Sequence, residues 1–183
     1  TAQTVTTTFE PDLIWSNIRN QALNHRLYDR VRGFGKTLLT NTSGAEDAIT
    51  DYGEPTATSS TSITVGQGNE SGNLINASGY TGLLWSWKAG GSAGSSNTNG
   101  SINTTSTSAN VDAGFSISTY AGTGSNATIG HGLSKAPEMV ITKKRNDSGD
   151  WMVQWNDDPT DYWRMNTTNV STDSNAAWND TAP

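Results

Sequence analysis

A stretch that occurs twice constrains this chain more than any other feature. Residues 10–20 read Glu-Pro-Asp-Leu-Ile-Trp-Ser-Asn-Ile-Arg-Asn, and residues 136–146 read Ala-Pro-Glu-Met-Val-Ile-Thr-Lys-Lys-Arg-Asn. The proline, the acid, three large apolar residues and the final Arg-Asn pair align without a gap, 126 residues apart (137 − 11). Because solenoid repeats are only roughly 20–50 residues long, this spacing predicts tandem whole domains.

The repeated stretch has the pattern of a buried β-strand. Alternation after the proline places Leu13 and Trp15 on one face and Ile14 and Ile18 on the other, so both faces are apolar. That pattern predicts a central strand of a sheet. The second copy has Ile141 in place of Trp15, and we therefore interpret Trp15 as a core residue.

A second strong strand is predicted within residues 80–91, which read Tyr-Thr-Gly-Leu-Leu-Trp-Ser-Trp-Lys-Ala-Gly-Gly. Leu83, Trp85 and Trp87 share one face of this strand, and we expect that face to lie in the core. The offset of the first stretch also aligns residues 38–41 with residues 164–167. These matches extend the predicted repeat beyond the opening stretch.

The repeat divides the chain into three parts. Residues 1–91 are expected to form a first repeat that lacks its opening strand, and residues 113–183 the truncated first part of a second repeat. Residues 92–112, rich in Gly, Ser, Asn and Thr, are expected to form a linker or a hairpin. We expect further copies on both sides, with Thr1 internal to a longer polypeptide.

Composition points to a folded β protein and excludes several classes of partner. Gly, Ser, Thr and Asn are abundant, and seven Trp supplement a hydrophobic fraction of only 32%. The net charge of −6 argues against nucleic acid as a partner, since phosphate binding needs basic patches. No apolar run approaches the roughly 20 residues that cross a bilayer, so no membrane partner is expected.

The sequence contains no convincing catalytic or cofactor-binding constellation, and we predict no enzyme activity. Its two histidines, His25 and His131, fall at a packing position and in a Gly-flanked turn, respectively. There is no cysteine, which excludes disulfides and thiolate metal sites. Two acidic turns, residues 146–150 and 156–161, offer oxygen ligands suited to Ca²⁺, although neither matches the twelve-residue calcium loop.

Several motifs together resemble a family of phage tail-fibre and virion proteins that is frequent in marine and cyanobacterial phages. They are the Pro-Asp stretch of residues 11–19, the Asn-His-Arg-Leu-Tyr-Asp segment that begins residues 24–33, and the Trp-Ser-Trp-Lys-Ala-Gly-Gly segment that ends residues 80–91. The junction, residues 112–117, 120–124 and 130–133, also resembles that family. The resemblance covers nearly the whole chain and carries no catalytic residues.

The resemblance implies an all-β fold made of β-sandwich modules, of concanavalin-like or jelly-roll-like type, in tandem. It also implies a virion location, other virion subunits as partners, and a homo-oligomer, a trimer being typical of fibres. We expect a non-enzymatic tail fibre or receptor-binding adhesin that contacts a host cell-surface glycan or protein. The alternatives are a structural appendage or capsid-decoration protein, and a carbohydrate-binding module of a secreted bacterial protein.

Overall fold

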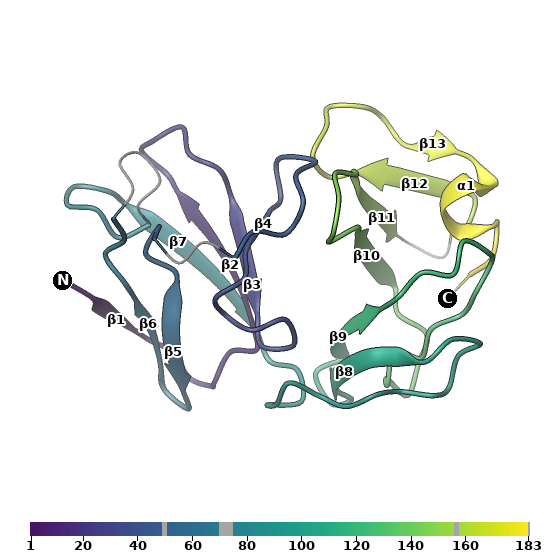
Figure 1. The fold of residues 1–183 in the computed structure, drawn as a ribbon, viewed down its shortest axis with the longest axis horizontal. Helices are drawn as coiled ribbons and strands as arrows, with labels where there is room; N and C mark the ends of the chain where they lie inside the picture. Colours follow the sequence, from purple (N-terminus) through teal and green to yellow (C-terminus); the bar gives the residue numbers. More distant parts are fainter. Residues whose placement is uncertain (49–50, 70–74, 156–157, 183) are drawn as a thin grey trace.

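The computed structural model describes residues 1–48, 51–69, 75–155 and 158–182, which form an all-β chain in two lobes (Figure 1). The first lobe contains β1 (Gln3–Thr6), β2 (Leu13–Ile18), β3 (Arg26–Asp29), β4 (Leu38–Leu39), β5 (Pro55–Ser59), β6 (Ser62–Val65) and β7 (Gly82–Trp87). The second lobe contains β8 (Thr104–Asn110), β9 (Phe115–Tyr120), β10 (Met139–Lys143), β11 (Trp151–Trp155), β12 (Asp161–Arg164), β13 (Thr172–Asp173) and the one-turn helix α1 (Asn175–Trp178). The prediction of an all-β protein is confirmed.

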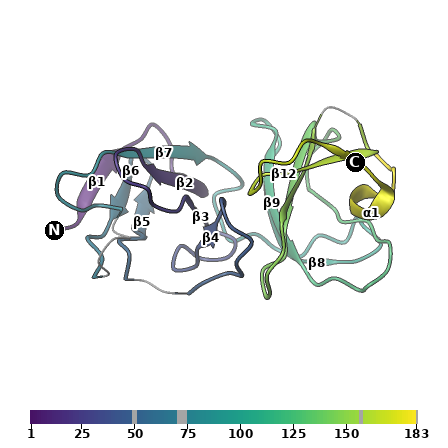
Figure 2. The same cartoon turned by 90° about the horizontal axis from the view of Figure 1, so that it is seen from above.

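Every pairing between the named strands is antiparallel. The first lobe has two sheets, of strand order β1-β6-β5 and β4-β3-β2-β7, and the second lobe has the hairpin β8-β9 and the sheet β10-β11-β12-β13. Figures 1 and 2 show the lobes side by side, joined where β7 leads into β8. β2 lies between β3 and β7, so its prediction as a central strand is confirmed.

The core of the first lobe lies between its two sheets. Ile14 on β2 is fully buried and packs with Ile63 and Val65 on β6. Leu84 on β7 packs against the same cluster. The inner face of β2 is therefore its Ile14 face, and each of these side chains contributes roughly 1.5–3 kcal/mol through burial.

The prediction that Leu83, Trp85 and Trp87 face the core is wrong. β7 pairs with β2 so that Leu84 lies opposite Ser16, and directly paired residues share a face of the sheet. Since Ser16 lies on the buried Ile14 face, Leu84 points inward and the tryptophans point outward. The register with β2 decides the orientation, and the more apolar face of β7 is left outside.

The opening repeat corresponds to a repeated piece of structure. Leu13 pairs with Asp29 between β2 and β3, and Met139 pairs with Trp155 between β10 and β11. Both partners are displaced by the same 126 residues (139 − 13 and 155 − 29), so the two strand pairs have one register. β10 nevertheless lies at the edge of its sheet, whereas β2 is central.

Two asparagines hold the next segment of each repeat. The Oδ1 of Asn41 accepts a hydrogen bond of 3.0 Å from the backbone N–H of His25. The Oδ1 of Asn166 accepts one of 2.9 Å from the backbone N–H of Trp151. Asn41 and Asn166 are 125 residues apart (166 − 41), so our gapless alignment of this segment is wrong by one residue.

Candidate functional site

The outer face of the sheet β4-β3-β2-β7 carries a row of aromatic and aliphatic side chains. Trp15 and Trp85 lie directly opposite each other on β2 and β7, with ring centroids 5.5 Å apart and planes inclined by 57°. Trp15 is half-buried on this face rather than in the core, and its Nε1–H donates a hydrogen bond of 3.1 Å to Thr40. Trp85 remains 44% exposed.

The row continues along β7 in both directions. Trp87 stacks on Phe115 of β9, with centroids 6.2 Å apart and planes inclined by 23°, and is still 36% exposed. Leu83, at the other end of the strand, has the same exposure. We call Trp15, Leu83, Trp85 and Trp87 the tryptophan face. Because contiguous apolar surface is unfavourable in water, such a face indicates a binding surface.

The second lobe has a comparable outer face on β10, β11 and β12. The pairing places Met139 opposite Trp155, and Val153 opposite Trp163. Its large apolar side chains that stay 42–49% exposed are Met139, Ile141, Trp155 and Trp163. Val153, at the centre of this face, and Trp151, on the same face of β11, are buried. The repeat thus reproduces an outward apolar surface as well as a register.

Contacts between the lobes converge on Glu46, which follows β4. Its Oε2 accepts hydrogen bonds from Arg32 at 3.1 Å and from Arg145 at 2.9 Å, and its Oε1 accepts a second bond of 2.9 Å from Arg145. Burial alone would raise the pKa of Glu46, but the bonds from Arg145 and Arg32 outweigh it and lower that pKa. The indole of Trp151 adds a 2.9 Å bond to the carbonyl oxygen of Leu39. We call the bonds of Arg145 to Glu46 and of Trp151 to Leu39 the inter-lobe contact.

A family profile described as a domain of unknown function (DUF7483) matches residues 1–183. The chain belongs to this family. No curated protein and no solved structure matches this DUF7483 domain.

The acidic turns proposed for Ca²⁺ use their carboxylates elsewhere in the DUF7483 fold. Asp150 forms an ion pair of 2.9 Å with Arg164, and Asp147 accepts from the Lys144 ammonium, which lowers the pKa of Asp147. Asp158 accepts from the backbone and side chain of Thr160. Residues 156 and 157 of the second turn lie outside the described residues. No group of three or more His, Asp or Glu suited to a metal occurs among the residues described.

The two histidines occupy the places that the sequence predicts. His25 immediately precedes β3, at the position where the second lobe has Trp151. The Nδ1 of His131 accepts a 3.0 Å bond from the backbone N–H of Leu133, within the turn. No helix in the part of the chain that the structure describes is long and apolar enough to cross a membrane.

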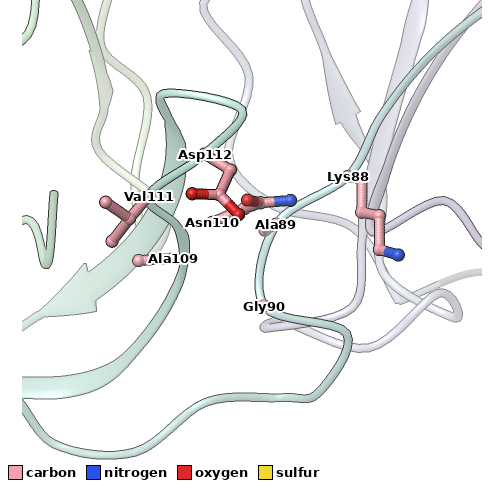
Figure 3. A pocket seen from close by; sticks show the side chains of 7 residues that line it. All are labelled: Lys88, Ala89, Gly90, Ala109, Asn110, Val111 and Asp112. Atoms are coloured by element: carbon pink, nitrogen blue, oxygen red, sulfur yellow. The ribbon is translucent and has the colours of Figure 1, made fainter.

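The junction between the lobes has an open depression of about 320 Å³, lined by residues 88–90 and 109–112 (Figure 3). Figure 3 shows Asn110 and Asp112 close to Ala89, while Lys88 points away from them. These side chains provide neither a nucleophile with a base nor paired acids at a reacting centre. The tryptophan face is therefore the stronger candidate site. Sequence reasoning found these four residues but placed all of them in the core.

Proposed function

We propose that this DUF7483 chain is a non-enzymatic part of a phage virion, most simply a tail fibre or receptor-binding adhesin that contacts a host glycan. The observation that carries the proposal is the outward orientation of Trp85 and Trp87 beside Trp15. The resemblance to tail-fibre and virion proteins supports the proposed location in a virion. Such a protein acts outside the cell, among other virion subunits, and a homotrimer is the assembly typical of fibres.

The chemistry of the tryptophan face suits a sugar better than a small charged ligand. An indole has a negative π-face, which attracts the weakly positive C–H groups on the flat side of a pyranose ring. Trp15 and Trp85 offer two such rings 5.5 Å apart on a sheet surface. Charged side chains lie mainly elsewhere: Arg30 binds Glu10 and Asp12, and Arg32 binds Glu46.

We further propose that the lobes are copies of one β-sandwich module in tandem. The shared register of β2–β3 and β10–β11 supports a common origin for both lobes. The packing of β2 on β6 supports a sandwich in the first lobe. Repetition would present several weak sites together, and avidity then exceeds a single affinity by roughly 10²–10⁴.

Replacing Trp85 with alanine is expected to weaken glycan binding with little loss of folding. Loss of one central aromatic contact costs about 1–2 kcal/mol, so the affinity should fall roughly 5–30-fold. Binding is measured on a glycan array and on host cells, with the chain displayed as multimers. Circular dichroism and thermal unfolding verify that the variant is folded.

The matched control is Tyr120→Ala, which removes an equally exposed aromatic ring from β9, outside the tryptophan face. This variant should bind like the unmodified chain. Equal loss of binding in both variants would contradict a site on the tryptophan face. Absence of any binding by the folded, multimerised chain would contradict the adhesin itself.

A structural appendage or capsid-decoration protein is the second candidate, and the inter-lobe contact favours it. Three hydrogen bonds from Arg145 and Trp151 join the lobes directly, as a stiff spacer requires. A spacer would retain this contact but bind no glycan. The binding assay above therefore separates the two functions.

A further inference from the structure

The outer edge of β10 lacks the strand that its equivalent, β2, carries. β2 pairs with β3 on one edge and with β7 on the other. β10 pairs with β11, and none of the described strands pairs with its opposite edge. Figure 1 shows β10 as the last strand of its sheet. Because the two strand pairs share one register, the free edge of β10 corresponds to the edge that β7 covers.

Side chains along this edge are exposed where their counterparts are covered. Leu13 and Trp15 are half-buried, since they lie opposite Trp87 and Trp85 of β7. Met139 and Ile141 occupy the equivalent positions and are 45% and 42% exposed. Edge strands with exposed apolar residues are ready to accept another strand.

Two side chains of the repeated stretch hold the ends of β7. Before the strand, the Asn20 side chain donates a 2.8 Å bond to the carbonyl of Gly79 and accepts a 3.0 Å bond from the N–H of Thr81. After it, Asp12 accepts bonds of 2.8 and 3.0 Å from two amides of the Ala-Gly-Gly turn. The acid and the asparagine of the repeat are thus clamps for an adjacent strand.

Both clamps recur beside β10 without a strand to hold. Glu138 corresponds to Asp12 (138 − 12 = 126), and Asn146 corresponds to Asn20 (146 − 20 = 126). Both residues are exposed, and their side chains make no hydrogen bond or ion pair with any residue that the structure describes. Because both clamps recur at this spacing beside a free strand edge, they indicate what kind of strand would bind to that edge.

We infer that the free edge of β10 binds an antiparallel strand of the β7 type. Its occupant is an extended segment with large apolar residues at alternate positions, as in Leu-Leu-Trp-Ser-Trp, followed by a small-residue turn. An indole would lie opposite Ile141, as Trp85 lies opposite Trp15. Asn146 would hold the beginning of the strand, and Glu138 would accept from the amides of the turn. Backbone bonds supply affinity and the side-chain pattern supplies selectivity.

The test uses the whole chain and a synthetic peptide with the sequence of residues 79–91. At the end of β2, the N–H of Arg19 donates to the carbonyl of Thr81 in the register of β7, so the odd-numbered amides within the strand face β7. The same alternation directs the amides of Met139, Ile141 and Lys143 to the free edge. With the peptide at about 1 mM, hydrogen exchange of these amides should slow roughly tenfold or more.

Two controls separate specific pairing from adhesion to an apolar surface. A peptide with proline in place of Leu83, whose amide faces the partner strand in the Asn17–Leu83 pair, cannot donate there and should give no protection. Substitution of both clamps, Glu138→Ala with Asn146→Ala, should weaken binding of the peptide at least several-fold without changing the structure of the free chain.

A second experiment uses a version of the chain that carries the peptide sequence on a flexible linker after residue 183. The linker raises the effective concentration of the peptide to the millimolar range.

The inference is overturned if β10 amides remain unprotected in both the peptide and the linked experiment. Protection of β2 alone would also overturn it, because the peptide would then be exchanging with β7. Dimerisation through β10 in the absence of peptide would assign the edge to a second copy instead. None of these outcomes depends on glycan binding, so the proposed function stands or falls separately.

Discussion

Asp12→Ala is expected to be among the most destabilising single substitutions in the chain, with a loss of about 3–5 kcal/mol in the free energy of unfolding. The Asp12 side chain is completely buried. Its Oδ1 accepts a 2.5 Å bond from Arg30, and its Oδ2 accepts the two amide bonds of Ala89 and Gly91. Alanine would leave one cation, the buried N–H of Ala89 and the partly buried N–H of Gly91 without this acceptor, and each such loss is costly.

The destabilisation by Asp12→Ala should extend to the second lobe, because the Ala-Gly-Gly turn that Asp12 holds packs against β8. A Cβ added at Gly90 would meet the carbonyl oxygen of Ala109 at 3.0 Å, so the turn lies directly on β8. Gly90 also donates a 3.0 Å bond to Ser108. Asp12 therefore fixes the place where the chain crosses between the lobes, and Asp12→Ala should speed hydrogen exchange in both β7 and β8.

Glu10→Gln is the matched control for this prediction. Glu10 binds the same Arg30 at 2.6 Å, but its side chain is 36% exposed. Loss of an exposed ion pair costs about 1 kcal/mol or less. Urea unfolding of the two variants at neutral pH measures the difference. Asp12→Ala and Glu10→Gln curves that coincide would contradict the clamp role of Asp12.

How far the sequence predicts the fold depends on whether a pattern is local. Alternation at β2 and the offset of the repeat are local or pairwise patterns, and they predict the strands and their equivalence. The orientation of β7 is different, because Trp85 and Leu84 are both apolar and only pairing with β2 decides which points inward. Hydrophobicity alone selects the tryptophan side, and that choice is wrong.

The candidate site was hidden from sequence reasoning for the same reason. A tryptophan-rich strand normally indicates a core, since large aromatic side chains gain most from burial. The informative signal is the second sheet of the sandwich. Ile63 and Val65 form the inner core with Ile14, and Leu84 is the residue of β7 that packs against them. Likewise, the clamp roles of Asp12 and Asn20 cannot be predicted from their own segments, because the residues that they bind lie at the two ends of β7, far along the chain.

Glu46→Gln is expected to destabilise the chain by about 2–3 kcal/mol at neutral pH and to loosen the inter-lobe contact. Glu46 is the shared acceptor of Arg32 and Arg145, and its side chain is only 13% exposed. Glutamine keeps the shape but removes the charge that both guanidinium groups require. Urea unfolding measures the stability, and hydrogen exchange at Trp151 and Leu39 measures the contact.

The pH dependence of this difference provides a second check with a definite sign. The pKa of Glu46 in the folded chain lies below its ordinary value of 4.5, because bonds from Arg145 and Arg32 outweigh the effect of burial. A lowered folded pKa gives stability that is complete above the unfolded pKa and is lost as the pH falls through the folded pKa. The difference in the free energy of unfolding between the unmodified chain and Glu46→Gln should therefore be constant near neutral pH and become smaller below about pH 4.5.

The control for the pH series is Glu138→Gln, which changes an exposed acid without a partner among the described residues. Its stability should follow the unmodified chain at every pH.

A double-mutant cycle that combines Glu46→Gln with Arg145→Ala should give a coupling of about 1–2 kcal/mol at neutral pH, since Glu46 and Arg145 share two hydrogen bonds. Additive effects of Glu46→Gln and Arg145→Ala would show that the lobes are joined by the indole of Trp151 and backbone bonds rather than by this ion pair.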